Sequence, residues 1–236
     1  MTQPKYKRIV IKVSGEALSG ETGFGLNTDT VSKVVDQIIE VQKMGVQIGI
    51  IVGGGNFWRG RQGNEMERST ADHMGMLATV INALALQDAF ERKGVATRVQ
   101  TALTITRVAE PYILRKALSH LDKGRIVIFA CGTGNPFFST DTGAALRSAE
   151  INADVLLLAK NVDGIYDSDP RVNKDAKKYD KVSYLECIAK ELKAMDTTAI
   201  TICKENKIPI IAFGLCEENA IKRVVLGEKI GTIIED

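Results

Sequence analysis

Runs of Val, Ile and Leu that alternate with helical patterns constrain the fold of this 236-residue chain more than any other feature. Several runs are nearly continuous in branched apolar residues, which is typical of parallel strands covered by helices on both faces. The predicted strands are Tyr6–Val13, Val46–Val52, Val95–Thr101, Arg125–Cys131, Asp154–Ala159, Ile208–Phe213 and Lys229–Ile234. The alternation predicts an α/β protein, a three-layer α/β/α sandwich with a mostly parallel central sheet, in a single domain over residues 1–236.

Helix boundaries are also readable between these strands. Asn27 is a good N-cap for an amphipathic helix that Gly45 stops. The run Ser69-Thr70-Ala71-Asp72 has the pattern of a capping box that opens a long helix, and Ser183 opens another in the same way. A further helix is expected to start near Thr142, and residues 161–182 form the longest irregular stretch, which favours a functional loop.

Composition excludes several classes of protein. The 31 basic and 29 acidic residues leave a net charge of +2, too balanced for a nucleic-acid footprint over the whole surface. No apolar run approaches the roughly 18 residues that span a bilayer, and the polar start of the chain has no signal-peptide core. The four cysteines lack CxxC spacing, which predicts reduced thiols and a cytoplasmic location. With only two histidines, no His-based metal site is expected.

Four polar, glycine-bearing segments each follow a predicted strand. In open α/β sheets, ligands bind beyond the carboxyl ends of the strands, so these segments are expected to meet in one site. They are Lys12–Glu16, Gly53–Gly60, Gly132–Thr142 and Lys160–Pro170.

The chemistry of these segments suits phosphate. Lys12 and Lys160 stand at strand ends, where an ammonium can meet a phosphate; for each, the alternative is an ordinary surface lysine. The three glycines from Gly53 allow close approach of backbone amides to an anion, with Arg59 able to clamp its oxygens. The P-loop pattern and G-x-G-x-x-G are both absent, which disfavours a dinucleotide site.

Two carboxylates in these regions are ambiguous from sequence. Asp141 is either a first-turn acid favoured by the helix dipole or a functional group, and Asp72 is either a cap or a ligand contact. Phe137 and Phe138 could wall a base or a sugar beside the free amides of a helix N-terminus.

The ordered motifs KxSGEAL, GGGNxxRG, ADxMGMLAT, TGNPFFxTDT and VDGxYxxDP resemble those of the bacterial uridylate (UMP) kinases in the amino-acid-kinase superfamily. The resemblance covers nearly the whole chain. It implies transfer of the ATP γ-phosphoryl group to UMP with Mg²⁺, in a homo-oligomer that is typically a hexamer, often activated by GTP and inhibited by UTP. One departure is Gly143, where relatives commonly have threonine or alanine, and the fourth segment is one residue shorter than the NNVDG form of some relatives.

The resemblance also implies residue roles. ATP would be contacted by Lys12, Val13, Ser14, Gly15, Gly55, Arg59, Asn161, Tyr166 and Asp169. UMP would be contacted by Gly54, Asp72, Thr133, Gly134, Asn135, Pro136, Phe137, Phe138, Ser139 and Thr140. The segment linked to GTP is Gly20, Glu21, Thr22, Gly23, Phe24 and Gly25.

Phosphoryl transfer needs charge neutralisation and positioning more than covalent chemistry. Lys12 and Lys160 are therefore predicted to be catalytic, with Asp141 orienting the lysines or Mg²⁺ and no side chain dedicated as a metal ligand. A phosphate acceptor is already largely a dianion at neutral pH, so no base is required. Two alternatives stay open: a related kinase acting on a carboxylate or carbamate, and a nucleotide-sensing module without turnover.

Overall fold

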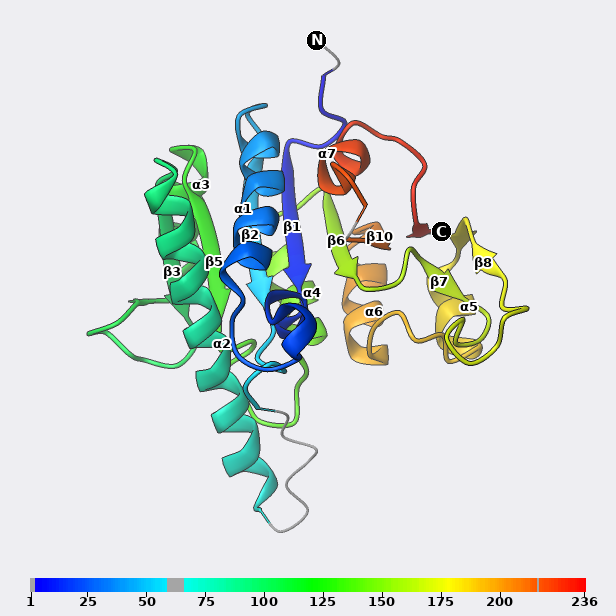
Figure 1. Ribbon diagram of the computed structural model, residues 1–236, viewed down its shortest axis with the longest axis horizontal. Helices are drawn as coiled ribbons and strands as arrows, with labels where there is room; N and C mark the ends of the chain where they lie inside the picture. The colour runs from blue at the N-terminus through cyan, green and yellow to red at the C-terminus, as the bar shows by residue number, and fades with distance from the viewer. Residues whose placement is uncertain (1–2, 59–65, 216) are drawn as a thin grey trace.

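The computed structural model describes residues 3–58, 66–215 and 217–236, and its centre is a nine-stranded sheet (Figure 1). The strand order is β4-β3-β5-β2-β1-β6-β10-β11-β9, and only β10 and β11 pair antiparallel. Its strands are β1 (Arg8–Val13), β2 (Gln47–Val52), β3 (Thr97–Thr101), β4 (Glu110–Pro111), β5 (Ile126–Ala130), β6 (Val155–Lys160), β9 (Lys181–Val182), β10 (Ile210–Gly214) and β11 (Thr232–Ile234). All seven predicted strands are confirmed, and the mostly parallel sheet agrees with the prediction.

Helices cover both faces of this sheet. They are α1 (Thr28–Gln42), α2 (Arg68–Arg92), α3 (Leu114–Asp122), α4 (Thr140–Glu150), α5 (Tyr184–Ala189), α6 (Thr197–Glu205) and α7 (Ala220–Val225), with short 3-10 turns η1 (Gly15–Leu18) and η2 (Gly20–Thr22). Figure 1 shows the N-terminal half of α2 reaching beyond the carboxyl ends of the strands.

Alternate residues of each central strand feed two separate hydrophobic cores. In β1, Ile9, Ile11 and Val13 pack with α1, α2 and α7, whereas Val10 packs with α3 to α6 on the other face. Both faces of these strands are buried, which explains why their sequences are nearly continuous in apolar residues. The two cores and the sheet between them form the expected three-layer α/β/α sandwich.

The register brings the functional segments to one edge. Lys12 pairs with Ile51 of β2 and with Leu158 of β6, so these three parallel strands end side by side. Strand β5 pairs with β2 in the same direction, through Ile51 and Phe129. The segments that follow β1, β2, β5 and β6 therefore leave the sheet at the same edge.

Helix boundaries differ from the prediction at two places that matter for the site. Helix α2 is capped by Glu67, whose carboxylate accepts the N–H groups of Ser69 and Thr70, so the predicted Ser69–Asp72 capping box is wrong. Helix α4 begins at Thr140, two residues earlier than expected, because Ser139 accepts the N–H groups of Asp141 and Thr142. The caps predicted at Asn27 and Ser183 are confirmed.

Residues 161–182 are more regular than predicted. They contain an antiparallel hairpin of β7 (Ile165–Tyr166) and β8 (Lys178–Tyr179), followed by β9. The side chain of Thr232 anchors this hairpin to β11 by accepting the Ile165 N–H at 2.8 Å. Within the described ranges, no helix has the length and apolar character needed to cross a membrane. Cys131, Cys187 and Cys203 are buried free thiols, and Cys216 lies outside the described residues.

Candidate active site

Two cavities open at the carboxyl edge of the sheet. The first, the Phe137 cavity, has a volume of about 470 Å³ and lies between the N-terminal turns of α2, the 131–139 loop and α4. Of the residues predicted for UMP, it is lined by Gly54, Asp72, Thr133, Asn135, Phe137, Phe138, Ser139 and Thr140. The second, the Tyr166 cavity, has a volume of about 410 Å³. It is lined by the predicted catalytic residue Lys160 and, of the residues predicted for ATP, by Lys12, Ser14, Asn161, Tyr166 and Asp169.

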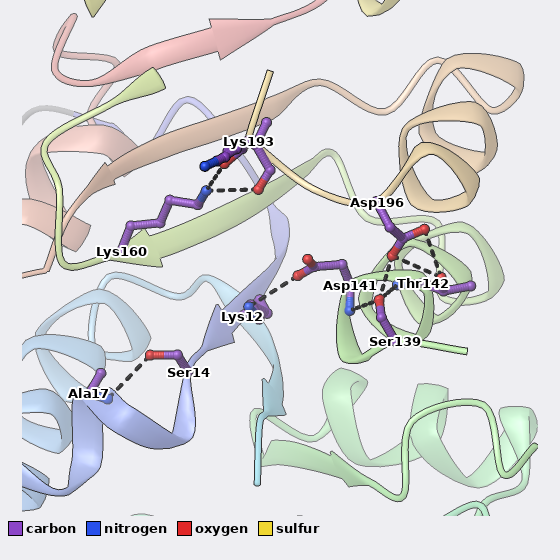
Figure 2. A network of polar contacts seen from close by, with 10 residues as sticks. Lys12, Ser14, Ala17, Ser139, Asp141, Thr142, Lys160, Lys193 and Asp196 are labelled. Atoms are coloured by element: carbon purple, nitrogen blue, oxygen red, sulfur yellow. Dashed lines mark hydrogen bonds and ion pairs between the residues drawn. The ribbon is translucent and has the colours of Figure 1, made fainter. Parts of the chain in front are cut away.

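Lys12 and Asp141 form an ion pair at this edge. The Lys12 Nζ lies 3.0 Å from Asp141 Oδ1, and the two side chains are 20% and 23% exposed. Figure 2 shows them pointing toward each other, Lys12 from the end of β1 and Asp141 from the first turn of α4. Asp141 is thus a first-turn acid and a partner of a strand-end lysine at once, and Lys12 presents its ammonium to the Tyr166 cavity.

Lys160 is held in a different way. Its Nζ donates to the carbonyl oxygens of Lys193 at 2.8 Å and Ala194 at 2.7 Å (Figure 2). Burial lowers the pKa of this ammonium, and the nearby positive charge of Lys12 lowers it further, whereas Asp141 raises it. Lys160 is therefore neither a free surface lysine nor a direct partner of Lys12. It joins the end of β6 to the segment that precedes α6.

The glycine loop after β2 is held against α2 by two buried asparagine side chains. Asn82 of α2 donates from Nδ2 to Gly53 O at 2.6 Å and to Asn56 Oδ1 at 2.7 Å, and Asn56 donates back at 3.0 Å. A Cβ on Gly54 would come within 2.8 Å of Gly75 O, which leaves no room for any side chain. The glycines therefore let the loop lie directly on α2 while its far side lines the Phe137 cavity.

Asp72 reaches across the Phe137 cavity instead of capping its helix. Its Oδ2 accepts the Phe137 N–H at 2.7 Å and the Arg68 Nε at 2.8 Å. Phe137 has a left-handed backbone (φ 71°), and the Arg68 guanidinium lies over its ring at 5.5 Å. An aromatic residue in this conformation is strained, so Asp72 and Arg68 act as the clamp that keeps Phe137 and its loop closed against α2.

Asp196 ties the opposite wall together (Figure 2). It is the N-cap of α6, accepting the Ala199 N–H at 2.9 Å, and it also accepts the hydroxyls of Ser139 and Thr142. Asp196 lines the Phe137 cavity, and the preceding residues 193 and 194 hold Lys160. One short segment thus connects the Lys160 ammonium to the N-terminus of α4.

Beside Lys12 and Lys160, the wall of the Tyr166 cavity contains several contacts between residues closer in the sequence. The Tyr166 hydroxyl donates to Asp163 Oδ1 at 2.6 Å, and Lys178 Nζ lies 2.9 Å from Asp163 Oδ2. Asp169 accepts three N–H groups of Arg171, which lowers the pKa of its carboxyl to about 2. The hydrogen bond from Tyr166 likewise lowers the pKa of Asp163.

Some predicted site residues lie elsewhere. Gly55, predicted for ATP, lines the Phe137 cavity, and Arg59 lies outside the described residues. Val13 and Gly15 are buried, and a Cβ on Gly15 would come within 2.8 Å of Gly55 N, so this glycine lets the first two segments touch. Gly134 and Pro136 belong to the loop that carries Phe137, without being among the residues that line its cavity.

The segment predicted to respond to GTP packs on the glycine loop. Gly25 accepts the Asn56 side-chain amide at 2.7 Å and donates its N–H to Asn56 O at 3.0 Å. Phe24 is 69% exposed and meets Phe57 edge-on, with ring centres 5.8 Å apart. Gly20, Gly23 and Gly25 all have positive φ, and Glu21 and Thr22 lie in η2 between the first two.

Sequence reasoning assigned no role to several residues of the site, although Trp58 and Thr142 lie in the segments that it expected to meet there. Arg68, Trp58, Thr79, Thr142, Asp196 and Thr198 also line the Phe137 cavity. Two of them carried a usable signal: Arg68 stands four residues before Asp72 on one helix face, and Asp196 precedes a helical run as a typical N-cap.

The carboxylates present suit a metal ion that arrives with a nucleotide. Among the described residues, no group of three or more His, Cys, Asp or Glu side chains is placed to hold a metal ion alone. Mg²⁺ is commonly held by one or two carboxylates together with substrate phosphates and water. Asp141, with Oδ1 paired to Lys12 and Oδ2 free of that pair, offers such a carboxylate.

A family model described as the amino acid kinase family matches residues 7–213. The chain belongs to the amino acid kinase family. This amino acid kinase is also similar to solved structures of UMP kinases. It is 39% identical to UMP kinase from Bacillus anthracis, over 98% of this chain and 96% of that one, with a TM-score of 0.95.

Two further structures extend this comparison. UMP kinase from Ureaplasma parvum is 36% identical over 98% of this chain and 100% of that one, with a TM-score of 0.92. Uridylate kinase from Archaeoglobus fulgidus is 27% identical over 96% and 99%, with a TM-score of 0.76. The resemblance inferred from the motifs is confirmed, because full-length similarity to UMP kinases accompanies the family match.

Proposed function

We propose that this amino acid kinase is a UMP kinase, which transfers the γ-phosphoryl group of ATP to UMP and yields UDP and ADP. The observation that carries the proposal is the arrangement of two cavities at one sheet edge. They are linked by an ion pair between Lys12, which lines the Tyr166 cavity, and Asp141, whose neighbours in the chain line the Phe137 cavity. The similarity to UMP kinases over 98% of the chain supports the same reaction.

In this proposal the Phe137 cavity binds UMP and the Tyr166 cavity binds ATP. Lys12 neutralises charge on the transferred phosphoryl group, and the buried glycine loop offers fixed N–H donors that need no reorganisation. Lys160 adds positive charge from the end of the neighbouring strand β6, held in place by the carbonyls of residues 193 and 194. Since the acceptor phosphate is already largely a dianion at neutral pH, no side chain has to remove a proton.

Mg²⁺ bound with ATP would supply further neutralisation of the phosphate charge. Asp141 is the residue of this chain that we expect to face it, through the oxygen that is not paired with Lys12. Asp141 also keeps the Lys12 ammonium at the end of β1, so its main role here is to orient that ammonium.

Assembly, regulation and location are part of the same proposal. Leu77 and Ile81 are 50% and 48% exposed one turn apart on α2, and this apolar pair supports association with further copies, as in a homohexamer. We expect a single-domain cytoplasmic enzyme of pyrimidine nucleotide synthesis, activated by GTP through residues 20–25 and inhibited by UTP. The contact of Gly25 with Asn56 gives the GTP segment a direct route to the glycine loop.

Two other functions predict different behaviour. A kinase for carbamate or an amino-acid carboxylate needs only a small acceptor pocket, whereas the Phe137 cavity has a volume of about 470 Å³ and three aromatic residues, Trp58, Phe137 and Phe138, in its lining. A nucleotide-sensing module has no use for a lysine–carboxylate pair between two cavities.

An ADP-release assay with UMP, CMP, carbamate and aspartate as acceptors tests the proposal. We expect turnover with UMP, and kcat/KM for UMP well over tenfold above that for CMP, since unpaired buried polar groups cost about 1–3 kcal/mol each. Equal use of CMP would contradict the predicted base selectivity, turnover with carbamate or aspartate alone would favour the related kinase, and no turnover with any acceptor would favour the sensing module.

A further inference from the structure

Arg147 on α4 is a buried cation with an unusually complete set of partners. Its side chain is 6% exposed, and its Nη1 lies 2.5 Å from Glu150 Oε2. The guanidinium carbon lies 3.7 Å from the centre of the Tyr112 ring, and the Tyr112 hydroxyl donates to the same Glu150 oxygen at 2.6 Å. Burying a charge is unfavourable unless it is paired and hydrogen-bonded, so a carboxylate and an aromatic ring together keep this arginine in the interior.

The remaining arm of Arg147 reaches the loop of the Phe137 cavity. Its Nη2 donates to the Gly132 carbonyl oxygen at 3.3 Å. One turn earlier on the same face of α4, Gly143 lies so close that a Cβ would come within 2.9 Å of Gly132 Cα. Helix α4 therefore contacts the peptide of Gly132 at two points, by close packing at Gly143 and by a hydrogen bond at Arg147.

The turn that α4 supports is strained. Cys131 has φ 65°, although it is not a glycine, and Gly132 and Gly134 follow at 53° and 82°. Such a backbone persists only where its surroundings hold it. Thr79 accepts the Cys131 N–H at 2.8 Å from the α2 side, and Arg147 holds the Gly132 carbonyl from the α4 side.

Holding this carbonyl fixes the direction of the next N–H group. The Gly132–Thr133 peptide is trans, so its C=O and N–H point to opposite sides. With the Gly132 oxygen turned to Arg147, the Thr133 N–H is directed away from Arg147. Within the part of the chain that the structure describes, this N–H has no hydrogen-bond partner, and Gly132 and Thr133 both line the Phe137 cavity.

We propose that Arg147 is a positioning residue for the acceptor: it holds the Gly132 carbonyl so that the Thr133 N–H is presented to an oxygen of the bound nucleoside monophosphate. This inference rests on the proposed function, because it takes UMP as the occupant of the Phe137 cavity. Tyr112 and Glu150 keep the guanidinium in place, and burial together with the bond to Glu150 raises the pKa of the Tyr112 hydroxyl, which keeps it protonated as a donor.

The test compares Arg147→Lys and Arg147→Met with the wild type in steady-state kinetics. Lysine keeps a positive charge for Glu150 but has no second planar arm for Gly132. In both variants we expect KM for UMP to rise about five- to tenfold, which corresponds to the loss of one hydrogen bond. KM for ATP and kcat at saturating UMP should stay within about twofold of wild type. The lost interaction binds the acceptor equally in the ground state and the transition state, so its loss raises KM for UMP without lowering kcat.

The matched control is Arg92→Lys, an exposed arginine on α2 whose one ion pair within the described ranges is with Asp88 in the same helix. It should change neither KM. A merely structural role of Arg147 would lower the melting temperature and affect both substrates alike. Unchanged KM for UMP in folded Arg147→Lys, or equal rises in both KM values, would overturn the proposal.

A second measurement needs no variant. UMP without ATP should slow amide hydrogen exchange at Thr133 in the wild-type protein, and an unchanged exchange rate there would overturn the proposal even if UMP binds. Failure of the proposed function is separate from both results. It would appear as absent UMP turnover by the wild type, in which case the Thr133 exchange with UMP still decides whether this N–H meets a ligand.

Discussion

The Phe137 cavity and the 167–171 segment of the Tyr166 cavity lie at the same edge of the sheet, but contacts of very different reach hold them. In the first, Asp72 holds a residue 65 positions away, Thr79 one 52 positions away and Asn82 one 29 positions away. In the second, Asp169 and Arg171 are two positions apart and Ser168 and Asn173 are five apart, whereas Lys160 of the same cavity reaches residues 33 and 34 positions away.

This difference makes the wall of the Phe137 cavity preorganised and the 167–171 segment of the Tyr166 cavity adjustable. Contacts that join distant elements can open only when the sheet and helices around them open, so the donors of the Phe137 cavity stay fixed. The ion pair of Asp169 with Arg171 is exposed and local, so it can exchange partners without disturbing the core. We therefore expect strict selection of the acceptor and adaptable binding of the donor nucleotide.

The largest effect is expected where the two cavities meet. Lys12→Met should lower kcat on the order of 10²–10³-fold, because its ammonium would meet charge that develops in the transition state. Single-turnover rates measure this directly. Lys7→Met, at an exposed position just before β1, is the control and should change nothing. Near-wild-type kcat in Lys12→Met would remove this lysine from the mechanism.

Lys160→Met should reduce kcat by on the order of 10²-fold and also lower the melting temperature. From the sequence alone, substitution of either Lys12 or Lys160 would be expected to leave the melting temperature unchanged. The structure changes this for Lys160, since its removal leaves two carbonyls without their donor; the partly buried one of Ala194 costs about 1–3 kcal/mol, whereas the exposed one of Lys193 can bind water. Thermal melts beside kinetics separate the two effects, and a normal melt would show that the two hydrogen bonds contribute nothing to folding.

A pair of carboxylate variants tests the comparison itself. Asp72→Asn should raise KM for UMP about tenfold, because the closed loop loses a charged acceptor. Asp169→Asn should raise KM for ATP only about threefold, as an exposed ion pair contributes little. Each variant should leave the other KM unchanged. Crossed effects, with Asp72→Asn altering ATP binding alone, would reverse the assignment of the cavities.

The smallest effect is on acid stability. The N–H groups of Ser69 and Thr70 lower the pKa of the Glu67 carboxyl from its ordinary 4.5 to about 2. The unfolded chain therefore binds more protons in this range, so ionised Glu67 stabilises the fold above pH of about 4.5, and this contribution is lost as the pH falls toward 2. Glu67→Gln should flatten the fall of melting temperature in that window.

Asp169→Asn is the matched control for this measurement. The pKa of Asp169 is also about 2, but its carboxylate organises only an exposed loop that can open locally. By the same linkage Asp169 also contributes, but local opening of its loop limits this contribution, so its substitution should flatten the curve less than that of Glu67. If both variants flatten the curve equally, the two walls are coupled to the fold to the same degree, and the proposed contrast between them is wrong.

The sequence was informative wherever a residue acts through its own backbone neighbours. Strand β1, the cap at Asn27 and the glycine loop could all be predicted because apolar runs, capping side chains and consecutive glycines are local signals. The predicted capping box at Ser69 was wrong because Glu67 sits two residues earlier and accepts both N–H groups. The motif also could not tell capping from a tertiary contact of Asp72.

Partners across the fold were not predictable in this way. Nothing near Asn82 in the sequence points to Gly53, and nothing near Asp196 points to Ser139, because these contacts depend on how the helices stack on the sheet. Arg147 looks like a helix charge of the kind that usually faces solvent, and only the packing of α4 reveals that it is buried. The residues that line the two cavities were thus easier to predict than the residues that hold them.

The Lys160 ammonium has more N–H donors than its two bonds to the 193–196 segment use. A lysine ammonium carries three N–H donors, and Lys160 gives two of them to carbonyl oxygens. The third is left for a ligand oxygen, so a phosphate can join Lys160 without evicting either carbonyl. A ligand can then bind in the Tyr166 cavity without movement of this segment. Asp196, at the end of the segment, keeps its hydrogen bonds to the hydroxyls of Ser139 and Thr142.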